Sequence, residues 1–382
     1  MSLRLTATLL YLALGFIPVA AAQTDSAPTA DQAPAAQSAS VDESDSVRKK
    51  AIRASTDRDG DSDSKRDKSE RPTVVRAKGK SADDERASRG VAPCLAWVNR
   101  DKPIQAVIVC VHGLGLHNGT YEAFGKRMAE LGYATYAIDV RGFGAWMEAK
   151  GRERVDFEHC LNDVRTTLKV VRRVHPGKPV FLLGESMGGA IALRVTSLYP
   201  ELVDGLISVV PAGDRFKQGK THLKVALNLF SSPNKPMKLG EGVVRQATQN
   251  EALRKSWLED PLARVNLSAK ELLQFQNFMN GNHEAAKSIM KTAVLIVQGC
   301  QDKLVRPEGT VELFNDLGTA DRQIVLIPKA EHLIFEEAQF TEEDITTVNT
   351  WIAAHLQKVP SIEAAAEVKK SDREEKSIGK LE

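Results

Sequence analysis

Aromatic residues are absent from residues 23–90 of this 382-residue sequence, although they make up 5% of the whole chain. The segment begins rich in Ala, Pro, Gln and Ser and then carries 14 acidic and 14 basic side chains. Such a composition cannot bury enough apolar surface to offset the entropy lost on ordering, so we expect a disordered polar linker. Asp57 and Asp63 around Gly60 are spaced as in a calcium loop. However, Arg66 stands where that loop needs Glu, so a solvated charge run is favoured.

An excess of charge of one sign is also missing. The formal net charge is +2, and the residues after position 90 carry 37 basic and 36 acidic side chains. This balance argues against a nucleic-acid partner, which would need a basic face. Four cysteines are too few for a disulfide scaffold at this length, and none has zinc-site spacing, so we expect no metal. One disulfide stays open for an exported chain, and Cys110, in an apolar run, is expected to be a core thiol.

The apolar run at the N-terminus is short. Residues 9–19 follow Arg4 and precede three alanines ending at Ala22. This is the pattern of a signal peptide, whereas a membrane span needs about 20 apolar residues. Residues 1–22 are therefore predicted to be cleaved near Ala22, and the protein to be exported to the periplasm or secreted. An uncleaved N-terminal membrane anchor is the alternative. Gln23 rather than Cys follows the cleavage site, which argues against a lipoprotein.

From about residue 91, short apolar runs alternate with longer stretches of helical periodicity. Strands that are covered on both faces are nearly continuous in Val, Ile and other apolar residues. On this basis we predict strands over residues 104–111, 134–138, 180–183, 206–210, 294–297 and 324–327, and helices over 121–131, 157–175, 187–199 and 346–356. The alternation predicts an α/β fold over residues 91–358, with a mostly parallel central sheet flanked by helices. A charged C-terminal tail, residues 359–382, follows.

Residues 213–287 interrupt this alternation, because they contain amphipathic helical pieces and prolines but no convincing strand. A largely helical insertion between two core strands predicts a lid over the site. Some of its apolar residues are candidates for lining an acyl-chain pocket, although the packing face of the lid is the more frequent explanation for any one of them. These candidates are Leu223, Val225, Leu227, Leu229 and Phe230.

The strongest motif is Gly184-Glu185-Ser186-Met187-Gly188, which directly follows an apolar strand and directly precedes a helix. This context is typical of a nucleophile elbow, a tight turn that lifts a serine hydroxyl clear of the sheet. The turn strains the serine backbone and leaves room only for glycine nearby. We therefore predict that Ser186 is a nucleophile.

A serine hydroxyl needs a base, and an acid that orients the base. His332 follows the predicted strand 324–327 after a short loop, at an edge where such sheets collect reactive residues. His283 and His355 lie in polar helical stretches and are weaker candidates. Asp302 follows the preceding strand, which gives the order serine, acid, histidine along the chain. Weaker candidates for the acid are Asp260 and Asp321.

An oxyanion that forms during ester cleavage needs preorganised donors. The backbone N–H of Met187, directly after the nucleophile, is one predicted donor. The loop His112-Gly113-Leu114-Gly115 follows the first long strand, and the N–H of Leu114 is the second. His112 is expected to shape this loop by hydrogen bonding rather than to act as a base.

Together these motifs resemble the monoglyceride lipase and lysophospholipase branch of the α/β-hydrolases, often described as serine aminopeptidase-like. The resemblance covers roughly residues 91–358. It implies a helical lid, no cofactor, and the roles of nucleophile, acid and base for Ser186, Asp302 and His332. The sequence departs from the family at Phe143, where His is frequent, and near Cys300. The matching segments are His112 to Gly115, Asp139 to Gly144, Gly184 to Gly189, Asp260 to Leu262, Gln298 to Asp302 and Ala330 to His332.

The leading functional hypothesis is a carboxylic ester hydrolase that acts on a monoacylglycerol, lysophospholipid or similar acyl ester through an acyl-enzyme. The expected partner is this small lipid substrate, with transient contact between the lid and a membrane surface as an option. A serine peptidase or amidase with the same triad is an alternative, for which Glu185 would be a candidate ligand of a free amine. A catalytically silent hydrolase fold used for binding is another, although such proteins typically lose a triad member.

Overall fold

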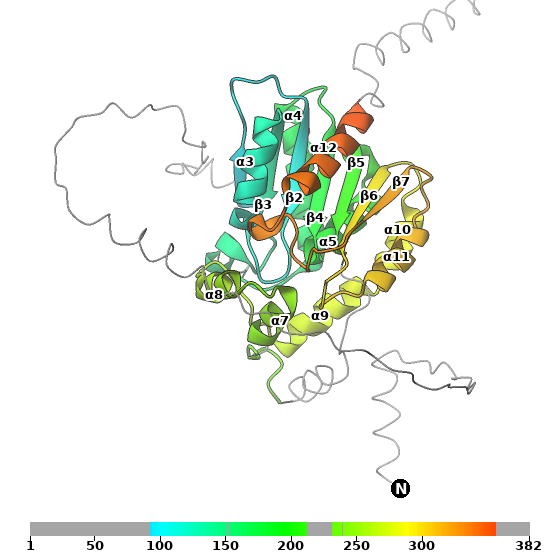
Figure 1. Ribbon diagram of the computed structural model, residues 1–382. Helices are drawn as coiled ribbons and strands as arrows, with labels where there is room; N and C mark the ends of the chain where they lie inside the picture. The colour runs from blue at the N-terminus through cyan, green and yellow to red at the C-terminus, as the bar shows by residue number, and fades with distance from the viewer. Residues whose placement is uncertain (1–91, 150, 152, 212–230, 239, 357–382) are drawn as a thin grey trace, which may run out of the picture. The chain divides into compact units, whose positions relative to one another are not determined.

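The computed structural model describes residues 92–149, 151, 153–211, 231–238 and 240–356. The predicted signal peptide, linker and C-terminal tail lie outside these ranges, as do residues 213–230 with all five candidate pocket residues of the insertion. Within these ranges, seven strands form one sheet in the order β1-β3-β2-β4-β5-β6-β7 (Figure 1). The strands are β1 (Cys94–Trp97), β2 (Ala106–Val111), β3 (Tyr133–Ile138), β4 (Val180–Glu185), β5 (Gly205–Val209), β6 (Ala293–Gly299) and β7 (Arg322–Ile327).

All neighbouring strands are parallel except β1, which runs antiparallel to β3 at one edge. Every residue of the central strands β2, β4, β5 and β6 is buried, as expected for strands covered on both faces. The predicted α/β fold with a mostly parallel sheet is therefore confirmed.

Helices cover both faces of the sheet and enclose two apolar cores (Figure 1). On one face, α3 (Glu122–Glu130) and α12 (Glu342–Leu356) share one apolar core with the sheet. The opposite core contains side chains from α4 (Phe157–Val174), α5 (Met187–Leu198) and α11 (Pro307–Asn315). Short 3-10 segments complete the connections: η2 (Asn118–Tyr121), η3 (Gly144–Glu148), η4 (Pro200–Leu202) and η5 (Glu336–Ala338).

The interval between β5 and β6 is helical in its described part. It contains α7 (Gly240–Ala247), α8 (Glu251–Glu259), α9 (Ala269–Met279) and α10 (Asn282–Ser288). The ring of Phe278 in α9 stacks on Phe157 at a centroid separation of 4.4 Å, which joins the insertion to α4 of the core. Trp257, Leu253 and Val244 form a small separate apolar cluster with Leu116 and Leu333 from loops of the core.

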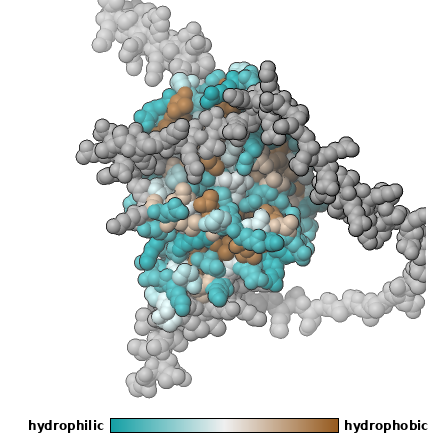
Figure 2. Space-filling view, turned by 90° about the vertical axis from the view of Figure 1, so that its left-hand side faces the viewer, coloured by the Kyte–Doolittle hydropathy of each residue, from teal (hydrophilic) through white to brown (hydrophobic). Residues whose placement is uncertain are grey.

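Three elements differ from the sequence-based expectations. The edge strand β1 and helix α11 were not predicted, and α12 begins at Glu342, four residues before the predicted start. All four cysteines are free thiols, and Cys110 is fully buried as predicted. No helix in the described ranges is long and apolar enough to cross a membrane. Large apolar side chains exposed on the domain are scattered, and Figure 2 shows small apolar patches among hydrophilic ones on one face.

Candidate active site

Ser186 occupies a strained turn between β4 and α5. Its φ and ψ are 56° and −116°, a left-handed conformation that is rare for a residue with a side chain. A Cβ on Gly184 would lie 2.1 Å from the carbonyl oxygen of Gly188, and a Cβ on Gly188 would lie 1.9 Å from that of Val111. Only glycine fits at both positions, as the elbow motif predicted.

The structure brings Ser186, His332 and Asp302 together from three separate loops. Nε2 of His332 lies 2.8 Å from Oγ of Ser186, and Nδ1 of the same ring lies 2.7 Å from Oδ2 of Asp302. All three residues are buried. Both distances are within hydrogen-bond range, so the histidine bridges the serine and the carboxylate. Such a chain can move the serine proton onto the imidazole while the carboxylate supports the resulting positive charge.

Asp302 is held in a fixed orientation by the loop after β6. Its Oδ1 accepts the backbone N–H groups of Leu304 at 2.7 Å and Val305 at 2.9 Å, while Oδ2 faces His332 and accepts a longer hydrogen bond from Nε2 of Gln298 at 3.4 Å. Burial alone would raise the pKa of this carboxyl, but His332 and the two N–H groups outweigh burial, and the pKa lies below its usual value. Asp302 is therefore a carboxylate at neutral pH, and Nδ1 of His332 is the ring nitrogen that donates to it.

The loop after β2 lies beside the serine. A Cβ on Gly113 would be 3.6 Å from Cβ of Ser186. Nε2 of His112 accepts the N–H of Val140 at 2.9 Å, so Nδ1 is the donor to the Gly113 carbonyl at 2.8 Å. Burial lowers the pKa of His112 to about 3. This side chain is a neutral hydrogen-bonding brace of the loop.

The two predicted oxyanion donors, the N–H groups of Leu114 and Met187, lie on this loop and at the first residue of α5. Neither donates a hydrogen bond to another residue in the part of the chain that the structure describes. Within the described ranges, each of these N–H groups is therefore without an acceptor. Their roles stay a prediction, because the structure holds no reacting oxygen.

The rival acids and bases lie in other pairs. Asp260 contacts His117 at 2.8 Å, and Asp321 contacts His355 at 3.3 Å. His283 contacts Asp316 at 2.6 Å. These pairs join elements of the fold, and none of them includes Ser186.

Glu185 is not placed as the alternative peptidase hypothesis required. Its side chain is fully buried and accepts the backbone N–H groups of Ile334, Phe335 and Glu336. A carboxylate whose oxygens are occupied by three buried N–H groups is not open to a substrate amine. This placement disfavours Glu185 as the candidate amine ligand of the alternative hypothesis, since sequence position beside the nucleophile does not show which way the side chain is buried.

Residues of the insertion support the backbone that carries His332, and this support was not predicted from the sequence. The carboxylate of Glu331 accepts the Thr248 hydroxyl and the Gln249 N–H, both at 2.8 Å. The N–H of His332 donates to the Ala247 carbonyl at 3.3 Å. The turn between α7 and α8 therefore fixes the backbone that carries His332. The only signal in the sequence is a Glu directly before the histidine, which has no distinctive spacing.

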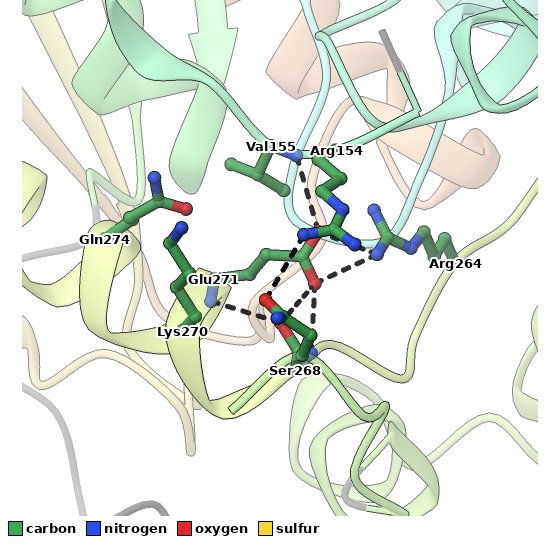
Figure 3. A pocket seen from close by; sticks show the side chains of 8 residues that line it. Arg154, Val155, Arg264, Ser268, Lys270, Glu271 and Gln274 are labelled. Atoms are coloured by element: carbon green, nitrogen blue, oxygen red, sulfur yellow. Dashed lines mark hydrogen bonds and ion pairs between the residues drawn. The ribbon is translucent and has the colours of Figure 1, made fainter. Parts of the chain in front are cut away.

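A small polar pocket lies between the insertion and the core (Figure 3). Its volume of about 80 Å³ is well below the roughly 300 Å³ at which small-molecule sites begin. Nη2 of Arg264 forms an ion pair with both carboxylate oxygens of Glu271, at 2.7 and 2.9 Å, and Glu271 also caps α9 through Ser268. We interpret the pocket as a site where the insertion is attached to the core. No group of His, Cys, Asp and Glu in the described ranges could hold a metal ion.

Comparison with known proteins places this arrangement in a family. A model of the family described as serine aminopeptidase, S33, matches residues 102–339. The monoglyceride lipase of Mus musculus is 27% identical over 270 residues, which are 69% of this chain and 87% of the relative. That of Homo sapiens is 28% identical over 268 residues, 68% and 86% of the two chains.

Among solved structures, the monoacylglycerol lipase of Paleococcus ferrophilus superposes with a TM-score of 0.57 at 25% identity. The match covers 69% of this chain and 98% of that one. The sheet topology and the position of the elbow are those of an α/β-hydrolase, in agreement with the family match. The chain therefore belongs to the serine aminopeptidase S33 family of α/β-hydrolases, in the branch of the monoglyceride lipases.

Proposed function

We propose that this protein, a carboxylic ester hydrolase by family, cleaves the ester of a monoacylglycerol or similar acyl lipid through an acyl-enzyme on Ser186. The observation that carries the proposal is the continuous hydrogen-bonded chain from Ser186 through His332 to Asp302, at 2.8 and 2.7 Å. A buried serine in a strained elbow with an oriented imidazole is the arrangement that makes a hydroxyl nucleophilic.

In the acylation step, Oγ of Ser186 attacks the carbonyl carbon of the ester while its proton passes to Nε2 of His332. The electron pair of the C=O bond moves to oxygen, and the N–H groups of Leu114 and Met187 stabilise the resulting oxyanion. The intermediate then collapses, the C–O bond to the alcohol breaks, and the leaving oxygen takes the proton from His332. The acyl group remains on Ser186 as an ester.

In the second step, a water molecule gives one proton to Nε2 of His332 and attacks the acyl carbon. The second tetrahedral intermediate collapses, the bond to Oγ breaks, and Ser186 recovers its proton from the imidazole. The carboxylic acid leaves. Asp302 accepts a hydrogen bond from Nδ1 throughout and stabilises the transient imidazolium, without becoming protonated itself.

The substrate class is supported by the matched relatives, which are monoglyceride lipases. A lid role for the insertion, with transient contact at a membrane surface, belongs to the proposal and follows from the helical character of this segment. Export of the mature chain rests on the pattern of residues 1–22. Amide hydrolysis by the same triad is a weaker candidate, because the burial of Glu185 removes the carboxylate suggested for binding a free amine.

A fluorophosphonate probe and a substrate panel test this function. The wild-type protein should be labelled covalently and should hydrolyse monoacylglycerol, whereas Ser186→Ala should lose both reactions. Ser197→Ala, a change elsewhere on α5 that removes only a hydroxyl bonded to the Arg194 carbonyl, is the matched control and should keep both. If the protein prefers a lysophospholipid to a monoacylglycerol, the head group of the proposed substrate must be corrected. Efficient cleavage of aminoacyl arylamides without ester hydrolysis would overturn the proposal.

A further inference from the structure

Two carboxyl groups lie fully buried next to the proposed catalytic serine. Glu185 precedes Ser186, and Glu336 follows His332 by four residues; neither has any exposed surface. Glu185 accepts three backbone N–H groups from residues 334–336 of the loop that carries His332. Both oxygens of Glu336 lie close to the N–H of Gly113, at 3.0 and 3.1 Å. The two acids therefore join the elbow, the histidine loop and the loop of the predicted oxyanion donor Leu114.

The hydrogen bonds around Thr120 indicate where a proton lies. Oγ1 of Thr120 is 2.7 Å from the carbonyl oxygen of His117 and 3.0 Å from Oε1 of Glu336. Two oxygen atoms at such separations attract only when a proton lies between them, and a hydroxyl has one proton to give. The shorter contact uses the proton of Thr120. The other contact then needs a proton from Glu336, with Oγ1 of Thr120 as its acceptor.

The surroundings of the two acids lead to the same assignment. The carboxyl groups whose charge acts on Glu336 are Glu185 and Glu337, and Glu336 also lies near the buried Cys110 and Tyr121. Burial, and then the charge of Glu185, raise the pKa of Glu336 well above its usual range. Burial raises the pKa of Glu185 to about 7, and its three N–H donors and the nearby His332 limit this rise by favouring its charged form.

We propose that Glu336 is a positioning residue that works as a neutral carboxylic acid. It donates its proton to Thr120 and accepts the N–H of Gly113, so that it fixes the loop that carries Leu114, while Glu185 carries the single negative charge of the pair. This proposal rests on the proposed function, because the loop matters through its oxyanion donor.

The neutral state is what makes Glu336 compatible with catalysis. A Cβ on Gly113 would lie 2.9 Å from Oε2 of Glu336 and 3.6 Å from Cβ of Ser186, so this carboxyl and the serine both border the same glycine. A second negative charge there would oppose the oxyanion. In a buried site such a repulsion slows the reaction roughly tenfold to hundredfold. A protonated acid gives the same two hydrogen bonds without this repulsion.

The first test measures the unfolding free energy of the full-length wild type and Glu336→Gln from about pH 5 to about pH 9. An acid that is protonated in the folded state and ionised in the unfolded state binds an extra proton on folding. Its contribution is therefore complete below the unfolded pKa and is lost as the pH rises toward the folded pKa. Gln cannot titrate and can make both hydrogen bonds, so the folding equilibrium constant of Glu336→Gln relative to wild type should rise by up to about tenfold per pH unit.

Glu342→Gln is the control, because Glu342 is an exposed acid that pairs with Arg127. Its stability relative to wild type should not rise with pH. A ratio for Glu336→Gln that is flat over this range, or that falls with pH, would show that Glu336 is ionised in the folded protein and would overturn the proposal. This readout does not depend on the reaction, so it stands even if the substrate class is wrong.

The second test compares kcat and KM on one ester. Glu336→Gln should keep kcat within about tenfold, whereas Glu336→Leu, which can make neither hydrogen bond, should lose roughly a hundredfold in kcat with little change in KM. Equal kcat for the two variants would refute the positioning role. If wild type itself hydrolyses no ester and is not labelled by a fluorophosphonate, the proposed function fails instead. If Glu336→Leu does not fold, the comparison of Gln with wild type across pH still decides.

Discussion

Asp302→Asn gives the sharpest test of the proposed proton path, because the structure fixes how the new amide must lie. Oδ1 of Asp302 accepts two backbone N–H groups at 2.7 and 2.9 Å. The carbonyl oxygen of Asn must take this position, since an NH2 group there would face two donors. The NH2 group is thereby placed at the site of Oδ2, which lies 2.7 Å from Nδ1 of His332.

An NH2 group at that position is a donor, so it selects the ring tautomer with a bare Nδ1 and a protonated Nε2. Nε2 is the atom 2.8 Å from the Ser186 hydroxyl, and once protonated it cannot accept the serine proton. The variant therefore carries the wrong tautomer as well as lacking a counter-charge. We expect kcat to fall by roughly 10³- to 10⁴-fold, as in other triads whose acid is changed to the amide.

Asp302→Ala is the informative companion variant. Alanine removes the counter-charge but enforces no tautomer, so its kcat should equal or exceed that of Asp302→Asn. Both are measured on a soluble short-chain ester, with circular dichroism as the check of folding. A loss of less than tenfold for Asn, or an Ala variant much slower than Asn, would contradict the assignment of Asp302 and would direct attention to other acids.

The remaining predictions concern stability, support, substrate and chain extent. The pKa of Asp302 is depressed in the folded protein, so its stabilising contribution is present above the unfolded pKa of about 3.9 and is lost as the pH falls through the folded pKa. The difference in thermal unfolding midpoint between wild type and Asp302→Asn should therefore narrow on acidification. Thr248→Val removes a donor to Glu331 and should lower kcat by roughly threefold to tenfold, whereas Thr248→Ser should not; equal values would exclude the support role. Activity should rise with acyl length by at most about fourfold per CH2, so a flat series of p-nitrophenyl esters would contradict an apolar acyl site. A chain beginning at Gly90 should fold and keep esterase activity, and insoluble or inactive material would show that residues 23–90 contribute to the domain.

The parts of the site that could be predicted are those that local sterics dictate. Gly184 and Gly188 are required because backbone atoms of α5 and β2, respectively, approach within about 2 Å of where a side chain would begin. This requirement leaves a sequence motif, and the motif locates Ser186. His332 and Asp302 follow because parallel strands end at the same edge of the sheet, so residues directly after two neighbouring strands meet there.

The parts that could not be predicted depend on tertiary burial. β1 has only four residues, three of them partly exposed, so its sequence lacks the continuous apolar character by which the inner strands were found. Glu336 follows the apolar run Leu333-Ile334-Phe335, which is an unusual place for a charged residue, but a sequence cannot show that Gly113 and Thr120 will surround it. For the same reason, the sequence could not show that three backbone N–H groups surround Glu185.

The described part of the insertion is attached to two loops of the site by hydrogen bonds. At one end, the Ala247 carbonyl accepts the N–H of His332. At the other, the Arg264 N–H donates to the Gly115 carbonyl at 2.9 Å, and its guanidinium donates to that of Gly142 at 3.0 Å. The insertion thus braces the loop of the proposed base and the loop of the proposed oxyanion donor at once. Separation of this part of the insertion from the core would break these bonds, so the positions of both loops depend on it.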